Sequence, residues 1–372
     1  MANNIVKKKF MHINLSGDPR EVGIIQGNLI KKYPDTIRFF ASKRKLISLK
    51  DIRHINEIYE EFCPELIEEI NGFSESLGVP MQNLRYYDYT LLTPRCSQFA
   101  ILSSKSVEQK IFVARNYDFS YRLDDMRLCK TSIKNNYAHL GFSTLLFGRI
   151  DGINEKGLAI TMSSAGFPVG NFPSMRPPKI KGLQFWAVIR TILDKCKNVD
   201  DSLKLVEKIP MAYNANFIVA DESGSMALIE TYDGVFGYKK IDSFDKENYL
   251  IATNHVVLPK LIYNDSKKMH NSKVRFDLVK SNLENNKLIS KDKIKQILSD
   301  PYPNGLSCHF YTEFFGTMNS AIYVPADRIV DICFGPGDYN PWYSISLNDN
   351  VDKEYDVVFP KERSPTGFWN LE

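Results

Sequence analysis

The period of the hydrophobic pattern changes near position 95, and this change constrains the fold more than any other feature of the chain. Before it, four apolar residues recur at helical spacing and a glycine then ends the helix: Leu66, Ile70, Phe73, Leu77 and Gly78. After it, short apolar runs alternate with turn residues, as in β-strands. The pattern therefore predicts a mainly helical leader, residues 1–95, ahead of a domain rich in strands, residues 96–372.

An earlier helix is expected in the segment SGDPREVGIIQGNLIKKY. Ser16 or Asp18 can cap its first turn, and Pro19 suits a helix start. The apolar residues Val22, Ile25 and Leu29 are expected to share one face. The run Lys7-Lys8-Lys9 is typical of a solvated strand edge rather than of a binding patch.

Strands and helices follow in alternating groups after Cys96. Strands are predicted in FAIL, IFVA, GFSTLLFGRI and GLAITMSS, the last two joined by a turn, DGINEK. Two helices follow at 183–195 and 201–208, then strands in NFIVAD, MALIET, VFGYKK and NYLIATN, helices near 273–283 and 292–298, and the hairpin FFGTMNSAIYV–PADR–IVDICFG. Neighbouring strands are joined by hairpin-length connections, which favours an α+β fold of packed antiparallel sheets covered by helices over a doubly wound parallel sheet.

Composition bounds the class of protein. Hydrophobic residues make up 43% of the 372 residues and charged residues 25%, as in soluble globular proteins. A net charge of +4 gives no reason to expect nucleic acid as a partner, and no segment has the apolar length of a signal peptide or a membrane span. The chain is expected to be cytoplasmic, either a monomer or a homo-oligomer.

Six cysteines are widely spread and form no CxxC pair, so neither a disulfide framework nor a zinc site is expected. One of them, Cys96, precedes the hairpin FAILSSKSVEQKIFVA, whose second strand ends in Arg115-Asn-Tyr-Asp118. In an antiparallel pair the start of one strand lies beside the end of the next. The hairpin therefore places a thiol next to a cation and a carboxylate, although a free cysteine is more often a small buried apolar residue.

The base that would activate this thiol need not be a histidine. Cleavage between Arg95 and Cys96 would leave an α-amine on the same residue as the thiol, and such an amine titrates near 7.7–8.0, roughly the range of a useful base. This is the N-terminal-nucleophile arrangement, and it makes the helical leader a propeptide that self-cleavage removes or nicks. A papain-like pair with His255 as base is the alternative, without the CGxCW context of those proteases.

Several stretches in order carry a family resemblance: GDPREVGIIQG, PELIEEINGFSESLGVP, CSQFA, ARNYDF, GINEKGLAI, ATNHVV and NSKVRFDLV. Together they resemble the choloylglycine hydrolase and isopenicillin N acyltransferase group of N-terminal-nucleophile hydrolases, over roughly residues 16–336. The GDPREVGIIQG stretch is similar to a leader motif of the acyltransferase branch. The resemblance implies a four-layer αββα fold.

The resemblance also implies a role for each residue that matches a motif of the group. Cys96 is expected to be the nucleophile, Arg115 and Asp118 to hold the thiol and the α-amine, and Asn254 to be the side-chain donor of the oxyanion hole. Arg275 matches a later arginine of this group, and is expected to orient the substrate or the site.

Two positions depart from the relatives. Arg95 stands where the penicillin-processing relative has glycine. Ser164 stands where bile-salt hydrolases carry an asparagine, so a second oxyanion donor is expected from a backbone amide there.

Aromatic residues surround the candidate site. Tyr117, Phe119 and Tyr121 follow Arg115, and Phe167 and Phe172 lie in the proline-rich loop 165–180. Pro168 and Pro173 exclude this loop from a central strand. We expect the loop to cover an apolar acyl pocket, with Tyr117, Phe119, Phe167 and Phe172 binding the substrate.

The function expected from the sequence is hydrolysis or acyl transfer at linear amides outside peptide backbones, through a thioester on Cys96. No metal or organic cofactor is expected, although coenzyme A thioesters could serve as acyl donors. The alternative of another class is a protein that keeps this fold and binds acyl ligands without turnover.

Overall fold

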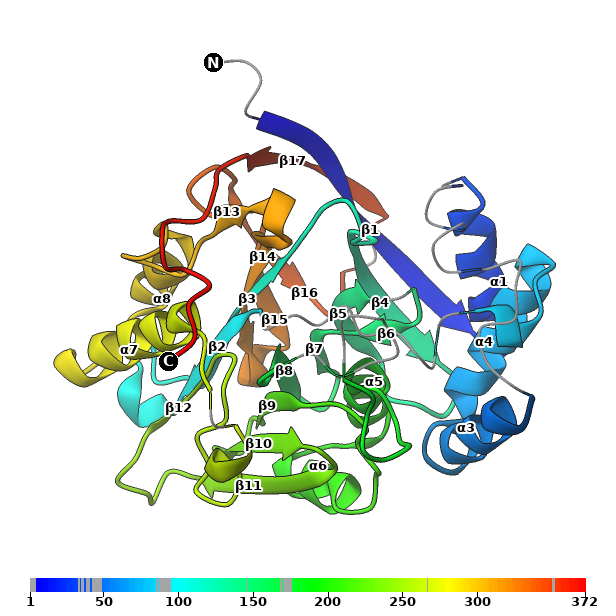
Figure 1. Cartoon of the computed structure of the whole chain (residues 1–372), viewed down its shortest axis with the longest axis horizontal. Coiled ribbons are helices and arrows are strands. Elements are labelled where there is room, and N and C mark those ends of the chain that lie inside the picture. The colour runs from blue at the N-terminus through cyan, green and yellow to red at the C-terminus, as the bar shows by residue number, and fades with distance from the viewer. Residues whose placement is uncertain are drawn as a thin grey trace.

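Two stacked β-sheets form the centre of the molecule, and helices cover their outer faces (Figure 1). The computed structural model describes residues 5–32, 34, 37, 41, 49–84, 86, 95–144, 146–167, 169, 176–265, 267–349 and 352–372. Strands β2 and β3 of one sheet pack against β8 and β9 of the other. The fold is thus α+β with the layer order αββα, as the resemblance implied.

The larger sheet has the strand order β11-β10-β9-β8-β7-β5-β4-β1-β17, with β6 paired to β5. Its strands are β1 (Ile5–Gly17), β4 (Arg127–Ile133), β5 (His139–Thr144), β6 (Gly148–Arg149), β7 (Asp151–Asn154), β8 (Ala159–Ser164), β9 (Ala215–Ala220), β10 (Met226–Tyr232), β11 (Val235–Ile241) and β17 (Lys353–Pro360). The pairs are antiparallel except for β1 with β4, which is parallel. A strand from the leader therefore lies between β4 and β17.

The smaller sheet has the order β12-β2-β3-β14-β15-β16, with β13 paired to β14. Its strands are β2 (Ser97–Ile101), β3 (Phe112–Phe119), β12 (Tyr249–Ala252), β13 (His309–Phe310), β14 (Phe315–Val324), β15 (Ile329–Phe334) and β16 (Trp342–Ser346). The register sets Ser97 opposite Asn116. The predicted hairpin after Cys96 is confirmed as β2 and β3.

Each sheet carries its own pair of helices. α5 (Phe185–Lys195) and α6 (Val199–Val206) pack on the larger sheet, and α7 (His270–Asn285) and α8 (Lys291–Ser299) pack on the smaller one. Asn198 caps α6 by accepting from the Asp201 N–H at 2.9 Å. Short 3-10 turns join these elements: η2 (Met81–Asn83), η3 (Ser103–Lys105), η4 (Ile262–Asn264), η5 (Tyr311–Glu313) and η6 (Pro325–Asp327).

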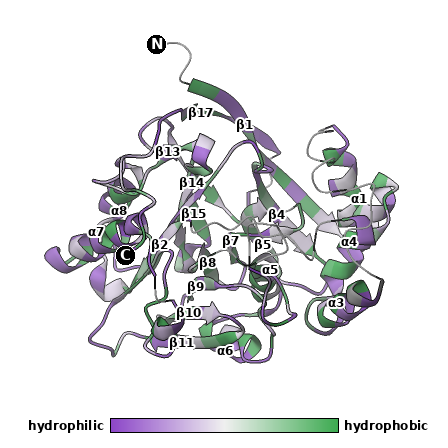
Figure 2. Ribbon diagram, viewed as in Figure 1, coloured by the Kyte–Doolittle hydropathy of each residue, from purple (hydrophilic) through white to green (hydrophobic). Residues whose placement is uncertain are grey.

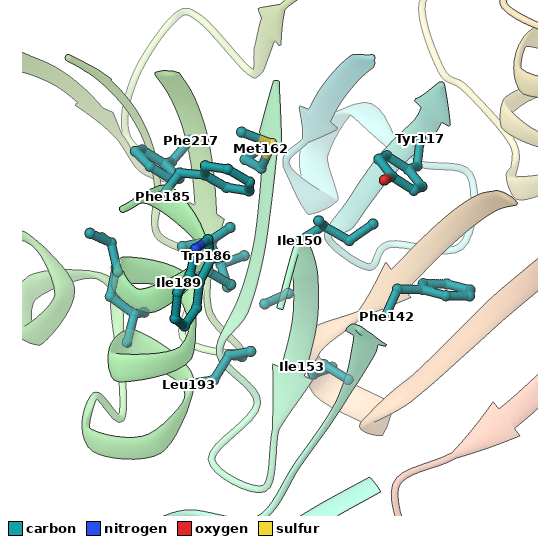
Figure 3. Close-up of a cluster of buried hydrophobic side chains, with 14 of the residues drawn as sticks. Tyr117, Phe142, Ile150, Ile153, Met162, Phe185, Trp186, Ile189, Leu193 and Phe217 are labelled. Carbon is teal, nitrogen blue, oxygen red and sulfur yellow. The ribbon is translucent and has the colours of Figure 1, made fainter. Parts of the chain in front are cut away.

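Two apolar layers hold the sheets and helices together. The main layer includes residues of both sheets and of α5, among them Trp186, which is fully buried (Figure 3). The second layer lies between the smaller sheet and α7 and α8, and includes Phe99, Val279 and Leu283. Burying each such side chain stabilises the fold by about 1.5–3 kcal/mol. The hydrophilic stretch near the start of β1 is the lysine run 7–9, which projects into solvent (Figure 2).

The leader contains the helices α1 (Pro19–Ile30), α3 (Leu49–Phe62) and α4 (Pro64–Leu77). Asp18 caps α1 and Pro19 occupies its first turn, as predicted. Gly78 ends α4 with a φ of 65°, a left-handed conformation that glycine adopts without steric cost. The predicted face of α1 is wrong at Ile25, which is 44% exposed; Gln26 is buried instead.

Close packing of α1 on α4 explains this change of face. A Cβ on Gly23 would lie 1.9 Å from the Glu69 carbonyl oxygen, and one on Gly72 would lie 2.0 Å from the Arg20 carbonyl oxygen. Any larger side chain at these two positions would push the helices apart. The glycines of the leader motif therefore let the two helix backbones touch, and turn Gln26 inward.

Two further elements differ from the prediction. The leader is not only helical, because the strand β1 runs along the larger sheet from Ile5 to Gly17. The segment DGINEK is not a turn throughout: Asp151–Asn154 forms strand β7, and the turn begins at Glu155. Alternation of apolar residues is hard to see in so short and fully buried a strand.

Candidate active site

Cys96 lies at the junction of the leader and the strand β2 (Ser97–Ile101). The residue is 2% exposed, and its φ is 79°, which is rare for a residue other than glycine. Such a backbone costs roughly 1–3 kcal/mol and persists only where the surrounding structure enforces it. The backbone of Cys96, directly after the Arg95–Cys96 bond, therefore carries local strain.

A guanidinium group holds the thiol. Arg115 Nη2 donates to Cys96 Sγ at 3.3 Å, while Arg115 Nη1 donates to Asp151 Oδ2 at 2.6 Å and to the Ile150 carbonyl at 2.9 Å. Arg115 and Asp151 are fully buried. Burial raises the pKa of the Cys96 thiol, and the positive charge of Arg115 opposes this rise. The thiol is thus held but still protonated in the uncut chain.

Asp118 approaches Cys96 from the end of β3. Its Oδ1 accepts a hydrogen bond from Thr317 Oγ1 at 2.7 Å, whereas Oδ2 has no hydrogen-bond partner among the described residues. Burial raises the pKa of Asp118; Arg275, Thr317, Arg115 and the backbone amide of Cys96 act in the opposite direction. The carboxyl group therefore lies beside the nitrogen that cleavage would release as an α-amine.

Asn254 and Ser164 meet at the carbonyl group of Arg95. Asn254 Nδ2 donates a short hydrogen bond to this oxygen and a second, of 2.8 Å, to the Ser164 carbonyl. The Ser164 hydroxyl accepts from the Arg95 N–H at 3.0 Å and lies 3.5 Å from the Arg95 carbonyl oxygen. The contact from Ser164 is thus made by its side chain, where a backbone amide was expected.

Arg275 fixes the orientation of Asn254. Its Nη2 donates to Asn254 Oδ1 at 2.7 Å, and its Nη1 donates to the Cys96 carbonyl and to Ser97 Oγ at 2.7 Å each. A guanidinium can only donate, so the atom of Asn254 that faces it must be the oxygen. The amide nitrogen then points to the Arg95 carbonyl. Arg275, on α7, is fully buried.

The aromatic residues divide into two groups. Tyr117 and Phe119 are buried, and their rings stack with centroids 6.0 Å apart, while the Arg115 guanidinium lies 5.1 Å from the Tyr117 ring centre. Tyr121 stacks on Phe359, away from this pair. Phe167 is 38% exposed and follows Gly166, whose N–H donates to the Asn254 carbonyl at 3.1 Å.

The predicted acyl-pocket lid falls only partly within the described residues. Phe172, with the two prolines of the loop, lies outside them, so the lid over an acyl pocket stays a prediction.

Among the described residues, His255 makes no hydrogen bond to the Cys96 thiol and meets the site through Ser272, whose Oγ also accepts from the Asn254 N–H at 2.8 Å. The His255 Nδ1 lies 2.8 Å from Ser272 Oγ, and its ring packs against Phe276 at 5.3 Å. It lines a pocket of about 480 Å³ on the side of α7, together with Lys268 and Lys273. Burial lowers the pKa of His255 to about 4. In the described part of the chain, no group of three or more His, Cys, Asp or Glu residues could hold a metal ion.

The structure thus brings together the residues that the sequence singled out: Cys96, Arg115, Asp118, Asn254 and Arg275. Residues 105–339, more than half of the chain, match the model of the acyl-coenzyme A:6-aminopenicillanic acid acyl-transferase family. The chain belongs to this family. Membership identifies it as an acyltransferase or hydrolase that acts on amides. The matched span begins after Cys96 and contains the other four residues.

Solved structures with weak overall similarity were also found. A C2A mutant of conjugated bile acid hydrolase from Clostridium perfringens is 12% identical, over 73% of this chain and 99% of that one, with a TM-score of 0.46. Penicillin V acylase from Agrobacterium tumefaciens is 16% identical, over 70% and 90%, at 0.42. An N-acylethanolamine-hydrolyzing acid amidase ortholog from Caenorhabditis elegans is 14% identical, over 62% and 93%, at 0.42. No curated protein matches the chain significantly.

Two residues of the site were missed by sequence reasoning. Asp151 begins the short strand β7, where the sequence predicts a turn, and a turn residue gives no indication of a buried pair with Arg115. Thr317 lies on β14, where β3 and β14 slip register. The only sequence signal for Asp151 was its place inside an apolar stretch, since a carboxylate there needs a buried partner.

Proposed function

We propose that the protein is an N-terminal-nucleophile cysteine amidohydrolase or acyltransferase that cleaves its own chain before Cys96 and then acts on linear amides outside peptide backbones. One observation carries the proposal. The Asn254 amide donates to the carbonyl of the Arg95–Cys96 bond while Arg115 holds the Cys96 thiol and the Cys96 backbone is strained. A carbonyl so polarised, next to a nucleophile, is arranged for attack.

Self-cleavage then proceeds by an acyl shift. The Cys96 sulfur forms a bond to the Arg95 carbonyl carbon, the bond from that carbon to the Cys96 nitrogen breaks, and the thiol proton passes to the departing nitrogen. Asp118, beside both groups, is the carrier of this proton. The products are a free α-amine and a thioester between Arg95 and Cys96, which water hydrolyses to the Arg95 carboxylate and the thiol.

Turnover of a substrate repeats this chemistry with the α-amine as base. The amine takes the thiol proton, the thiolate attacks the acyl carbonyl, and the leaving amine takes the proton away. Asn254 stabilises the oxyanion, which is typically worth about 2.7–4 kcal/mol for one such donor. Water or a second amine resolves the thioester, and a coenzyme A thioester could supply the acyl group in the transfer reaction.

The leader is expected to stay bound after the cut. Strand β1 pairs with β4 on one side and with β17 on the other. Glu69 of α4 also forms a buried ion pair of 2.7 Å with Arg190 of α5. We therefore divide the chain into a leader, 1–95, that is nicked rather than lost, and a catalytic domain, 96–372.

The six cysteines are all free, which suits the reducing cytoplasm, and we place the enzyme there. No helix among the described residues has the length and apolar character to cross a bilayer. The reaction needs no metal or organic cofactor, and neither nucleic acid nor a membrane has a part in it. Either a monomer or a homo-oligomer fits the mechanism.

The intact mass of purified protein tests the proposal. We expect two fragments, one ending at Arg95 and one beginning at Cys96, whereas Cys96→Ala should remain full length. Cleavage of Cys96→Ala at the same bond would assign the cut to another protease and remove the basis of the mechanism. An uncut, folded wild-type chain that binds acyl amides without releasing amine would support the alternative of a silent acyl-binding protein.

A further inference from the structure

The residue before the proposed cut, Arg95, lies in an aromatic slot. Its guanidinium carbon is 5.0 Å from the ring centre of Phe119 and 5.7 Å from that of Phe314, and the residue is 5% exposed. The two rings are 6.4 Å apart and inclined at 56°. Because the rings are inclined and not parallel, a flat cation held against both of them can stack on one ring at a time, while cation–π attraction comes from both.

Phe314 is held in place at a conformational cost. Its φ is 58°, a left-handed conformation that is unfavourable for a bulky residue. The preceding Glu313 anchors this turn, since its carboxylate accepts from the Ser364 N–H at 2.9 Å, from Ser364 Oγ at 2.6 Å and from Trp369 Nε1 at 2.7 Å. Phe314 is half-buried, whereas Phe119 is 7% exposed, so the slot has a closed floor and a more open outer wall.

The slot also reaches the nucleophile. Phe119 stacks on Tyr117, and the guanidinium over Tyr117 is that of Arg115, which contacts the Cys96 thiol. The aromatic wall therefore runs from the Arg95 side chain to the sulfur.

The bond geometry of the thioester indicates where the acyl chain of a substrate lies relative to the Arg95 side chain. In the thioester that self-cleavage forms, the carbonyl carbon is trigonal. The sulfur of Cys96 and the oxygen held by Asn254 fix two of its three positions, so the third, which leads to the Arg95 side chain, is also fixed. A substrate thioester uses the same sulfur and the same oxygen site. Once the cut lets the Arg95 end of the leader withdraw, the first carbon of the substrate's acyl chain takes the place of the Arg95 Cα, from which the Arg95 side chain leads to the two rings.

We propose that the slot between Phe119 and Phe314 is the acyl-group subsite of the enzyme. It takes acyl groups that end in a planar group, a guanidinium or an aromatic ring, carried about as far from the carbonyl as the guanidinium of Arg95. The inference rests on the proposed function, because it needs the thioester on Cys96, and it adds the chemical class of the acyl group.

Matched amides test the preference in the processed protein. Three substrates share one chromogenic amine and differ in the acyl group: 5-guanidinopentanoyl, 5-phenylpentanoyl and octanoyl. We expect kcat/KM for at least one planar substrate to exceed that for octanoyl by about 3- to 10-fold. Phe119→Leu and Phe314→Leu should remove this advantage, and Phe244→Leu, at a 96% exposed position, should keep it. Octanoyl turnover as fast as that of both planar substrates would overturn the proposal while leaving the proposed function intact.

Self-cleavage provides a second test that needs no added substrate. The rate of the cut is followed by pulse-chase after cell-free synthesis in the wild type, Arg95→Leu, Phe314→Leu and the double variant. If the guanidinium uses the slot, each single change slows the cut by roughly 3- to 10-fold and the double variant is no slower than the slower single one. If the double variant is slowed by the product of the two single effects, Arg95 and Phe314 act independently, and the proposed use of the slot is overturned. If all of these variants are still cut and Cys96→Ala is cut as well, the proposed function is refuted instead.

Discussion

The two sheets differ in how they depend on the leader. The smaller sheet is built from strands that follow Cys96, from β2 to β16. The larger sheet includes β1 of the leader, and β17 is joined to that sheet only through β1 in the described residues. A cut before Cys96 would leave the strands of the smaller sheet in one fragment and divide the larger sheet between two fragments.

The site itself draws on both sheets. Arg115 and Asp118 lie on β3 of the smaller sheet, whereas Asp151 and Ser164 lie on β7 and β8 of the larger one. Loss of order in the larger sheet should therefore reach the thiol through Asp151 and the scissile carbonyl through Ser164. The leader can therefore support catalysis by completing the larger sheet, without contributing a catalytic group itself.

The largest effect is expected from omitting the leader. Residues 96–372 expressed alone should fail to give folded protein, because β17 loses its partner and β4 gains an open edge. Circular dichroism and gel filtration measure the outcome, with full-length Cys96→Ala as the control that keeps the leader attached. A monomeric fragment with the native spectrum and cooperative unfolding would show that the larger sheet does not need β1.

A second prediction compares how much two ion pairs contribute to stability. Both pairs join α4 of the leader to α5. Glu69→Gln removes one of the two carboxylates that pair with the buried Arg190 guanidinium, the other being Asp194, and should lower the free energy of unfolding by about 3 kcal/mol. The matched control is Glu65→Gln, whose pair with Lys195 at 3.1 Å is partly exposed and is worth about 0–1 kcal/mol.

Denaturant unfolding of both variants in the Cys96→Ala background measures the comparison. Equal losses in Glu69→Gln and Glu65→Gln would contradict the idea that the buried pair locks the leader in place.

The sequence predicted the parts of the site that are local. Cys96 and Arg115 belong to one hairpin, so their contact follows from the pairing of β2 with β3 alone. The place of β1 could not be predicted in this way, because its partners β4 and β17 are remote in sequence and pairing carries no local signal. Ile25 was misplaced for a related reason: the face of α1 is set by the glycine contact with α4.

A third prediction concerns the link from the larger sheet to the thiol. Asp151→Asn removes the carboxylate that holds Arg115 Nη1, so the guanidinium can turn away from Cys96 Sγ, and its charge then no longer opposes the burial-driven rise of the thiol pKa. The thiol pKa should rise further, and kcat/KM should fall by roughly 10- to 100-fold, as expected for a misplaced group. The pH dependence of kcat/KM and the rate of thiol alkylation test this, since a merely structural role would not shift the alkylation profile to higher pH.

Asp151→Glu is the conservative variant and should recover part of the activity. An unshifted alkylation profile in Asp151→Asn would contradict a role through Arg115.

The smallest effect is expected at the face of the smaller sheet that is turned to α7. His255→Gln should change kcat/KM by less than about threefold, because the ring contacts Ser272 and not the thiol, whereas loss of a general base costs about 10²–10⁴-fold. Burial lowers the pKa of His255 from 6.5 to about 4 in the folded state. Between these values the unfolded chain binds more protons, so folding stability falls as the pH drops through this window. His255→Gln should weaken that acid sensitivity, seen as a smaller loss of Tm between pH 7 and pH 4.5 than in the wild type. A loss of several orders of magnitude in kcat with an intact fold would instead make His255 the base and support the papain-like mechanism.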